Sequence, residues 1–408
     1  MNIYLRRFIY LVLFVFVYTA CDDFEDVPPQ TDNEYLVSQE KITNYSLIEI
    51  NIIVNAIALQ YPDMAAIKDE FTSGVDVYKI AYNTTFDGEI RRASGLVCLP
   101  TESGSYPIMS YQNGTNTLHS AAPSADPESN LFRLLEMMSS TGFVVAIPDY
   151  LGFGEADDMF HPYLDKESTV QSVLDMMKAV KEMVASQESV ELNNDLYING
   201  YSQGGWATMA VQHAIDGGQL NGFNLKASSC NAGPHYLVGF TDWLLAKETY
   251  PMPYFLAYLY NSYMNLGMTT PIDSIFQQPY ADKVPTLFDG TKSGQEINAE
   301  LTTTVTDLFT PGFIENWNKG GIYESLYSML EDNSNYGYST STPMLFIHGD
   351  ADTFVPSSMS ESLYTDFITN GVSQDRLNIF LLPGMDHTDA IIPAGLASMK
   401  WFIEIKNQ

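Results

Sequence analysis

Short apolar runs alternate with amphipathic segments along most of the chain. Alternating or almost wholly apolar runs predict strands at 75–85, 93–100, 107–111, 143–150, 195–201, 225–232, 343–349 and 377–384. Helical spacing of apolar positions predicts helices at 46–60, 64–71, 127–140, 167–187, 203–216, 357–369 and 388–406. Short buried strands joined by helices indicate an α/β fold, with a mostly parallel sheet covered by helices on both faces.

One long interval interrupts this alternation. Residues 236–340 include 19 Tyr, Phe and Trp side chains, a higher share than the 13% of the whole chain. A structureless loop of that length is not expected inside a compact domain. We therefore expect residues 235–341 to form a helical lid inserted into one core, whose two parts are residues 46–234 and 342–408.

The first residues have the layout of a secretory signal. Arg6 and Arg7 precede an apolar run that is too short to span a bilayer comfortably, and small residues follow at 19–20. With Cys21 directly after them, the segment resembles a bacterial lipoprotein signal, in which the cysteine is lipidated. This resemblance implies a signal peptide at 1–20, a lipid anchor on Cys21 and an acidic tether at 21–45. The alternative is an ordinary signal peptide with an incidental cysteine.

The acidic patch that follows the cysteine resembles the surface-export signals of some Gram-negative lipoproteins. It comprises Asp22, Asp23, Glu25 and Asp26. The predicted location is therefore the cell envelope, with the protein held at the outer membrane by its N-terminal lipid, and the acidic patch raises surface exposure as an open alternative. Which face of that membrane carries the protein is left open.

Composition excludes several classes of protein. Hydrophobic residues make up 45% of the chain and charged residues 17%, which does not fit an intrinsically disordered protein. The net charge of -31 would repel phosphate backbones, so we predict no nucleic-acid partner. Beyond the anchor, Cys98 and Cys230 are expected to be small buried residues, and a disulfide between them stays open.

The first catalytic motif follows a predicted strand. Residues 200–204 read GYSQG, which is G-x-S-x-G between a strand and a helix. The glycines are needed because the turn is tight, and the turn lifts the serine hydroxyl to the carboxyl end of the sheet. Ser202 is therefore the candidate nucleophile. The alternative is a serine that only caps the helix.

The second motif places a carboxylate after a later strand. Residues 348–356 read HGDADTFVP, and Gly349, Asp352, Val355 and Pro356 match the G-x-x-D-x-x-V-P context of the acid in the α/β-hydrolase family, which the sequence resembles here. Asp352 is therefore the candidate acid, and Asp350 is interpreted as a turn residue. His348 is interpreted as a strand-end residue.

The third motif is PGMDH, at residues 383–387, after the last predicted strand. Of the six histidines in the chain, His387 is the one that follows both the serine and the acid. The order Ser202, Asp352, His387 is that of α/β-hydrolases. An imidazole activates the serine as its base, and a carboxylate fixes the imidazole tautomer.

The tetrahedral intermediate of such a reaction needs two backbone donors for its oxyanion. One is expected to be the N–H of Gln203, directly after the nucleophile. The other is expected in the loop after strand 107–111, which reads YQNGT at 111–115. Relatives often have H-G-x there, and this chain has Asn113 in place of the histidine. Thr115 is then the candidate donor, and an ordinary Asn-Gly turn is the alternative.

The resemblance extends over residues 75–405. The segment PDYLGFGEADDMFHPYLDKES at 148–168, together with the long insertion, is similar to the secretory-lipase branch and related bacterial hydrolases. This likeness implies a serine hydrolase that cleaves carboxylic esters through an acyl-serine intermediate. His161, within the segment, is interpreted as loop packing.

Two other functions remain open at this point. A serine peptidase of the prolyl-oligopeptidase type uses the same triad, and a noncatalytic surface-binding lipoprotein could have kept the fold. The motifs of metal and nucleotide sites do not occur in the sequence, so it predicts neither a metal nor a cofactor.

Overall fold

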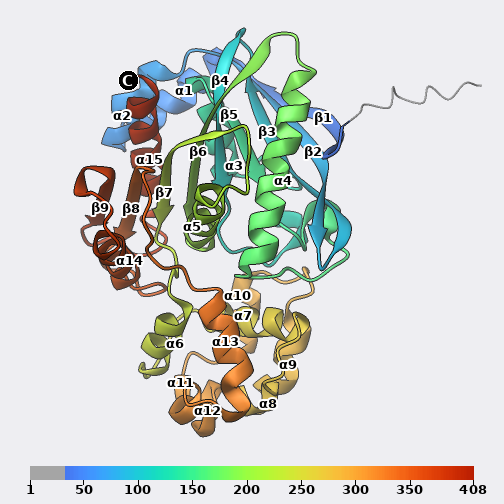
Figure 1. The fold of residues 1–408 in the computed structure, drawn as a ribbon, viewed down its shortest axis with the longest axis vertical. Helices are drawn as coiled ribbons and strands as arrows, with labels where there is room; N and C mark the ends of the chain where they lie inside the picture. The colour runs from blue at the N-terminus through green and yellow to red at the C-terminus, as the bar shows by residue number, and fades with distance from the viewer. Residues whose placement is uncertain (1–32) are drawn as a thin grey trace, which may run out of the picture. The chain divides into compact units, whose positions relative to one another are not determined.

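Nine strands form a single sheet in the computed structural model, which describes residues 33–408 (Figure 1). The strands are β1 (Leu36–Tyr45), β2 (Val75–Phe86), β3 (Glu89–Pro100), β4 (Gly104–Gln112), β5 (Val144–Pro148), β6 (Val190–Tyr201), β7 (Asn224–Asn231), β8 (Met344–Gly349) and β9 (Leu377–Leu382). Their order is β1-β2-β3-β5-β4-β6-β7-β8-β9. Along this order, the three neighbouring pairs from β1 to β5 are antiparallel. The five neighbouring pairs that follow, from β5 through β4 to β9, are parallel.

Helices cover both faces of the sheet, as the apolar strands predict. In β5, Val144 and Ala146 pack in the core that includes α4 (Lys166–Ala185) and α5 (Gln203–Asp216), while Val145 packs on the opposite face. That second face lies against the helices α1 (Leu47–Ala58), α2 (Pro62–Ile67), α3 (Asn130–Met137) and α15 (Ile391–Lys406). Alternate side chains of one strand thus enter two different cores, which is why these strands are almost wholly apolar.

The predicted tether is wrong in its second half. Residues 36–45 form β1, which pairs antiparallel with β2 along its whole length. Most side chains of β1 are exposed, so the segment lacks the apolar pattern of a buried strand. Its backbone hydrogen bonds to β2 hold it at the sheet edge, and its polar side chains suit an edge strand. The rest of the predicted tether, residues 21–32, lies outside the described residues, as does the predicted signal peptide.

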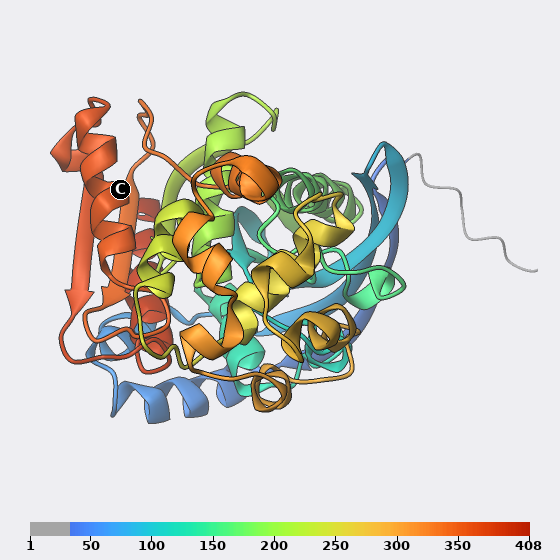
Figure 2. The ribbon, with the colours of Figure 1, turned by 90° about the horizontal axis from the view of Figure 1, so that it is seen from below.

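A helical insertion connects β7 to β8. It contains α6 (Leu237–Leu245), α7 (Tyr254–Asn265), α8 (Ile272–Ile275), α9 (Tyr280–Leu287), α10 (Gly294–Glu300), α11 (Val305–Leu308), α12 (Pro311–Asn316) and α13 (Glu324–Asp332). Figure 2 shows these helices, in yellow and orange, lying across one end of the sheet. Many of its aromatic side chains pack on one another: the ring of Tyr260 lies 6.0 Å from that of Phe276 and 5.9 Å from that of Phe313.

The two ends of the insertion are joined near the sheet. The Asn335 amide N–H donates to the His235 carbonyl oxygen at 2.6 Å, and the Leu237 N–H donates to the Ser334 hydroxyl at 2.9 Å. The indole of Trp206, on α5, donates to the Asn333 carbonyl at 2.9 Å. These bonds fix the stem of the insertion to the helix that follows the candidate nucleophile.

The two remaining cysteines do not form a disulfide. Cys98 lies in β3 and Cys230 in β7, and both are free and fully buried. Burial raises the pKa of both thiols, which keeps them protonated at neutral pH. They act as small apolar core residues.

A buried carboxyl group lies on the second face of the sheet. Glu136, on α3, is fully buried, and the Tyr45 hydroxyl donates to its Oε2 at 2.6 Å. Its Oε1 has no hydrogen-bond partner among the described residues. Burial raises the pKa of Glu136 from 4.5 to about 7.

We expect Glu136→Gln to stabilise the protein more at pH 8 than at pH 5. The folded state binds this proton more tightly than the unfolded chain, so the stability from this group falls as the pH rises from about 4.5 to about 7. Glutamine keeps an acceptor for Tyr45 and removes the buried charge, a gain of about 2 kcal/mol at pH 8. Urea unfolding of both proteins at the two pH values measures the difference. An equal change at both would contradict the assignment.

Candidate active site

Ser202 lies on the sharp turn between β6 and α5. Its backbone has φ 60° and ψ −121°, a conformation that L residues rarely adopt. The chain passes itself closely here: a Cβ on Gly200 would lie 2.2 Å from the Gly204 carbonyl oxygen, and one on Gly204 would lie 1.9 Å from the Gln112 carbonyl oxygen. The two glycines of the motif are therefore required sterically, and the turn places Ser202 at the end of the sheet.

Asp352 and His387 come together because β8 and β9 are adjacent and parallel. Asp352 follows β8 and His387 follows β9, so both lie at the same end of the sheet. The His387 Nδ1–H donates to Asp352 Oδ2 at 2.5 Å. The other carboxylate oxygen, Oδ1, accepts the N–H groups of Phe354 at 2.8 Å and Val355 at 2.9 Å. The backbone after the acid thus holds the carboxylate in place.

The acid stays ionised at neutral pH. Burial by itself would raise the pKa of Asp352, but hydrogen bonds from His348 and His387 outweigh it and hold that pKa well below its usual range. Asp350, by contrast, is exposed and accepts the Gly384 N–H at 2.6 Å. That contact joins the two loops after β8 and β9, and it makes Asp350 a turn residue in this structure.

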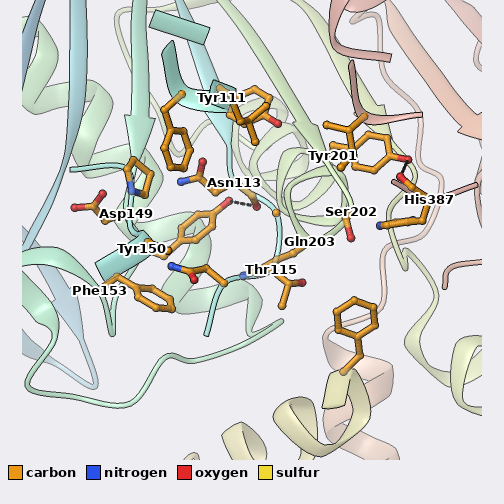
Figure 3. A pocket seen from close by; sticks show the side chains of 18 of the residues that line it. Tyr111, Asn113, Thr115, Asp149, Tyr150, Phe153, Tyr201, Ser202, Gln203 and His387 are labelled. Carbon is orange, nitrogen blue, oxygen red and sulfur yellow. Dashed lines mark hydrogen bonds between the residues drawn. The ribbon is translucent and has the colours of Figure 1, made fainter. Parts of the chain in front are cut away.

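Ser202 and His387 line the same cavity, which has a volume of about 380 Å³ (Figure 3). Both side chains are buried. No hydrogen bond joins Ser202 to His387 among the described residues; in a free enzyme such bonds are often long and shorten when substrate binds. The Tyr201 hydroxyl donates to the His387 carbonyl oxygen at 2.7 Å, and the Tyr201 ring lies 5.1 Å from the imidazole.

The two predicted oxyanion donors belong to residues that line this cavity beside Ser202 (Figure 3). Gln203 begins α5, where backbone N–H groups have no partner within the helix. Thr115 lies in the loop after β4, and its hydroxyl is hydrogen bonded to the Tyr163 hydroxyl at 2.8 Å. The Asn113 side-chain amide donates to the Pro148 carbonyl and anchors the loop to β5. The structure thus brings both candidates to the nucleophile, and their role as donors stays a prediction.

His161 supports the residue after the nucleophile. Its Nδ1 donates to the Leu151 carbonyl at 2.7 Å, which leaves Nε2 to accept the Gln203 side-chain amide at 2.9 Å. Burial lowers the pKa of His161 to about 4, so the ring is neutral at physiological pH. Its ring also stacks on Tyr150. The sequence interpretation of His161 as loop packing agrees with these contacts, although its bond to Gln203 was not foreseen.

His348, which the sequence pattern indicates is a strand-end residue, also contacts the candidate acid. His348 is fully buried, and its Nε2 lies 3.2 Å from Asp352 Oδ2. The spacing of four residues between them was visible in the sequence. Only the loop geometry after β8 decides that the side chain turns toward the carboxylate.

Aromatic and aliphatic side chains form most of the cavity wall. The core contributes Tyr111, Phe132, Tyr150 and Phe153, and the helical insertion adds Met252, Tyr254 and Phe255. Lysine and arginine are absent from this lining among the described residues.

One carboxyl group, that of Asp149, also lines the cavity. It accepts the hydroxyls of Ser94 and Ser124, both at 2.5 Å, and the Ser124 N–H at 2.8 Å. Burial raises the pKa of Asp149. Because its oxygens already accept these bonds, the group supports the cavity wall, and the site suits an uncharged, largely apolar ligand.

Comparison with known proteins gives two kinds of likeness. The model of the prolyl oligopeptidase family matches residues 130–217, which span α3 to α5. No curated protein matches the sequence. A provisionally named hydrolase from Legionella pneumophila has a similar solved structure, with a TM-score of 0.80 and 26% identity over 92% of this chain and 99% of that one.

Two further solved structures share the fold. The rice cell wall degrading esterase LipA from Xanthomonas oryzae has a TM-score of 0.74 and 23% identity, over 91% of this chain and 97% of that one. Candida antarctica lipase A in its closed state has a TM-score of 0.63 and 17% identity, over 90% and 81%. The sheet, the strand-turn-helix at Ser202 and these likenesses place the chain among the α/β-hydrolases. It is a serine hydrolase of that class.

Proposed function

We propose that the protein hydrolyses neutral carboxylic esters through an acyl-Ser202 intermediate. The observation that carries this proposal is that His387, which is hydrogen bonded to the buried Asp352, lines one largely apolar cavity together with Ser202. The esterase and lipase activities named for the two structural neighbours support the same reaction class.

In the first half of the proposed reaction, Ser202 Oγ attacks the ester carbonyl carbon while His387 Nε2 takes the hydroxyl proton. Asp352 accepts the His387 Nδ1–H, which fixes the tautomer and stabilises the imidazolium. The carbonyl oxygen becomes an oxyanion that the N–H groups of Gln203 and Thr115 stabilise. The tetrahedral intermediate then breaks its C–O bond, His387 returns the proton to the alkoxide, and the alcohol leaves.

In the second half, water replaces the alcohol. His387 takes a proton from water, and the hydroxide oxygen attacks the acyl carbon bound to Ser202. Collapse of the second tetrahedral intermediate breaks the bond to Ser202 Oγ, and His387 returns the proton to that oxygen. The products are the carboxylic acid and the free enzyme.

Peptide hydrolysis is the second candidate, because the matching family model is that of prolyl oligopeptidases. That match covers α3 to α5, the part of the core that carries the nucleophile turn, and so it bears on that turn more than on the substrate. Among the described residues, the cavity wall has no lysine or arginine that would bind a peptide carboxylate.

We expect esters to be cleaved faster than amides. Matched p-nitrophenyl esters and aminoacyl p-nitroanilides give kcat/KM values that compare the two reactions directly. Esters with short or medium acyl chains should react best, because the cavity is apolar and of limited volume. Faster cleavage of an anilide than of every ester would favour the peptidase. Failure of Ser202 to react with a fluorophosphonate probe would favour a noncatalytic binding protein.

We further propose that a lipid on Cys21 anchors the protein in the cell envelope, at the outer membrane. Within residues 33–408, none of the helices combines the length and the apolar character needed to cross a bilayer. Cys21→Ser should therefore release the protein into the soluble fraction, because the lipid would be its hydrophobic anchor. Fractionation followed by immunoblotting measures this. A variant that stays in the membrane fraction would point to an uncleaved N-terminal segment.

A further inference from the structure

His348 makes three hydrogen-bond contacts that the proposed reaction does not use. It is fully buried near the end of β8. Its Nε2 lies 2.9 Å from the Val355 carbonyl oxygen and 3.2 Å from Asp352 Oδ2, and its Nδ1 lies 2.8 Å from the Ser360 hydroxyl. Ser360 is in α14 (Ser358–Thr369) and is itself buried.

These partners determine the tautomer of His348. A carbonyl oxygen and a carboxylate can only accept, so Nε2 must carry the hydrogen that both of them share. The other nitrogen, Nδ1, then accepts the hydrogen of the Ser360 hydroxyl. A neutral imidazole satisfies all three contacts, and its N–H donates to the same Asp352 oxygen that accepts from His387.

We propose that His348 is a positioning residue for the catalytic acid, an inference that rests on the proposed function of Asp352. The carboxylate receives N–H groups from Phe354, Val355 and His387 as well as from His348. The N–H of His348 holds Asp352 Oδ2 from a second direction, and the negative charge of that oxygen is then shared between two hydrogen-bond donors. Without it, Oδ2 interacts with His387 alone, and the imidazole loses part of its orientation.

Because Asp352 accepts hydrogen bonds from both His348 and His387, loss of the His348 donor should change how activity depends on pH. A carboxylate with one donor fewer stabilises the imidazolium form of His387 more strongly. The acid limb of the kcat/KM profile then moves to higher pH, because the base must be unprotonated to accept the serine proton.

Three other titratable groups interact electrostatically with this cluster. They are Tyr201 and Tyr250, near Asp352, and His235, near His348. Burial raises the pKa of both tyrosines well above 10 and lowers the pKa of His235 to about 3. All three stay neutral between pH 5 and pH 9, so a shifted profile reports on His348, Asp352 and His387.

Two substitutions of His348 separate positioning from packing. Glutamine can place an amide donor where Nε2 stands, whereas asparagine reaches toward Ser360 but is too short to reach Asp352. We expect His348→Asn to lower kcat about tenfold with KM unchanged and to move the acid limb upward. His348→Gln should retain most of the wild-type kcat and keep the acid limb close to its wild-type position. Ser360→Ala is the matched control, because it removes a buried partner of the ring and leaves the donor to Asp352.

Equal losses in His348→Asn and Ser360→Ala, with an unmoved pH profile, would overturn the proposal, as would a His348→Gln variant no better than His348→Asn. Circular dichroism and thermal unfolding show whether each variant is folded. If His348→Asn does not fold, His348→Leu, which also lacks the donor and fills the site with apolar atoms, replaces it with the same expected loss.

The rate of Ser202 labelling by a fluorophosphonate probe keeps this test independent of the substrate. If the wild-type protein labels but cleaves no ester, the proposed ester reaction fails, and the positioning role is then judged by labelling alone. His348→Asn should label about tenfold more slowly than wild type. An unchanged labelling rate would overturn the positioning role whatever bond the enzyme cleaves.

Discussion

Replacing Ser202 by alanine should abolish ester hydrolysis and leave the fold unchanged. The hydroxyl is the proposed nucleophile, and without it the acyl intermediate cannot form, a loss of about 10⁴-fold to 10⁶-fold in kcat. Its side chain makes no hydrogen bond among the described residues, so the thermal midpoint should move little. Hydrolysis of p-nitrophenyl butyrate and differential scanning calorimetry measure the two effects.

His387→Ala is the partner experiment, because base and nucleophile act as a unit. It should lower kcat by a similar factor, and Ser202→Ala combined with His387→Ala should cost little more than either alone. Fluorophosphonate labelling should disappear in Ser202→Ala. More than a tenth of wild-type activity in either single variant would show that another residue is the nucleophile or the base.

Asp352→Asn should cost about 10⁴-fold in kcat, and Asp350→Asn only a few-fold. In the first variant, an amide N–H can face His387 Nδ1 and force the proton to Nε2, so that the imidazole can no longer accept the serine proton. In the second, the asparagine oxygen can still accept the Gly384 N–H, and among the described residues the exposed Asp350 side chain has no hydrogen bond to a histidine.

The two aspartates form a matched pair, since they are two residues apart and undergo the same substitution. Measurement of kcat and KM for one ester with both variants is sufficient to compare the two losses. The larger loss is expected in kcat, because Asp352 acts on the transition state through His387. A larger loss in Asp350→Asn would mean that Asp350, and not Asp352, is the acid of the triad.

The sequence alone determined the class of fold and the candidate triad. Continuous apolar runs identify strands buried on both faces, so β5 to β8 could be predicted, together with the helices α4 and α5. G-x-S-x-G has meaning at a strand-turn-helix, and both glycines are sterically required there. His387 could be found because it follows the serine and the acid in the chain.

Only the tertiary structure decided the edge of the sheet and the support of the site. The β1 strand carries mostly exposed side chains, and its pairing with β2 comes from backbone hydrogen bonds, which leave no hydrophobic pattern in the sequence. The bond from His161 to Gln203 joins segments 42 residues apart, and the approach of His348 to Asp352 depends on the turn between them. Apolar periodicity reports burial, whereas such polar contacts depend on loop geometry that forms when the strands assemble.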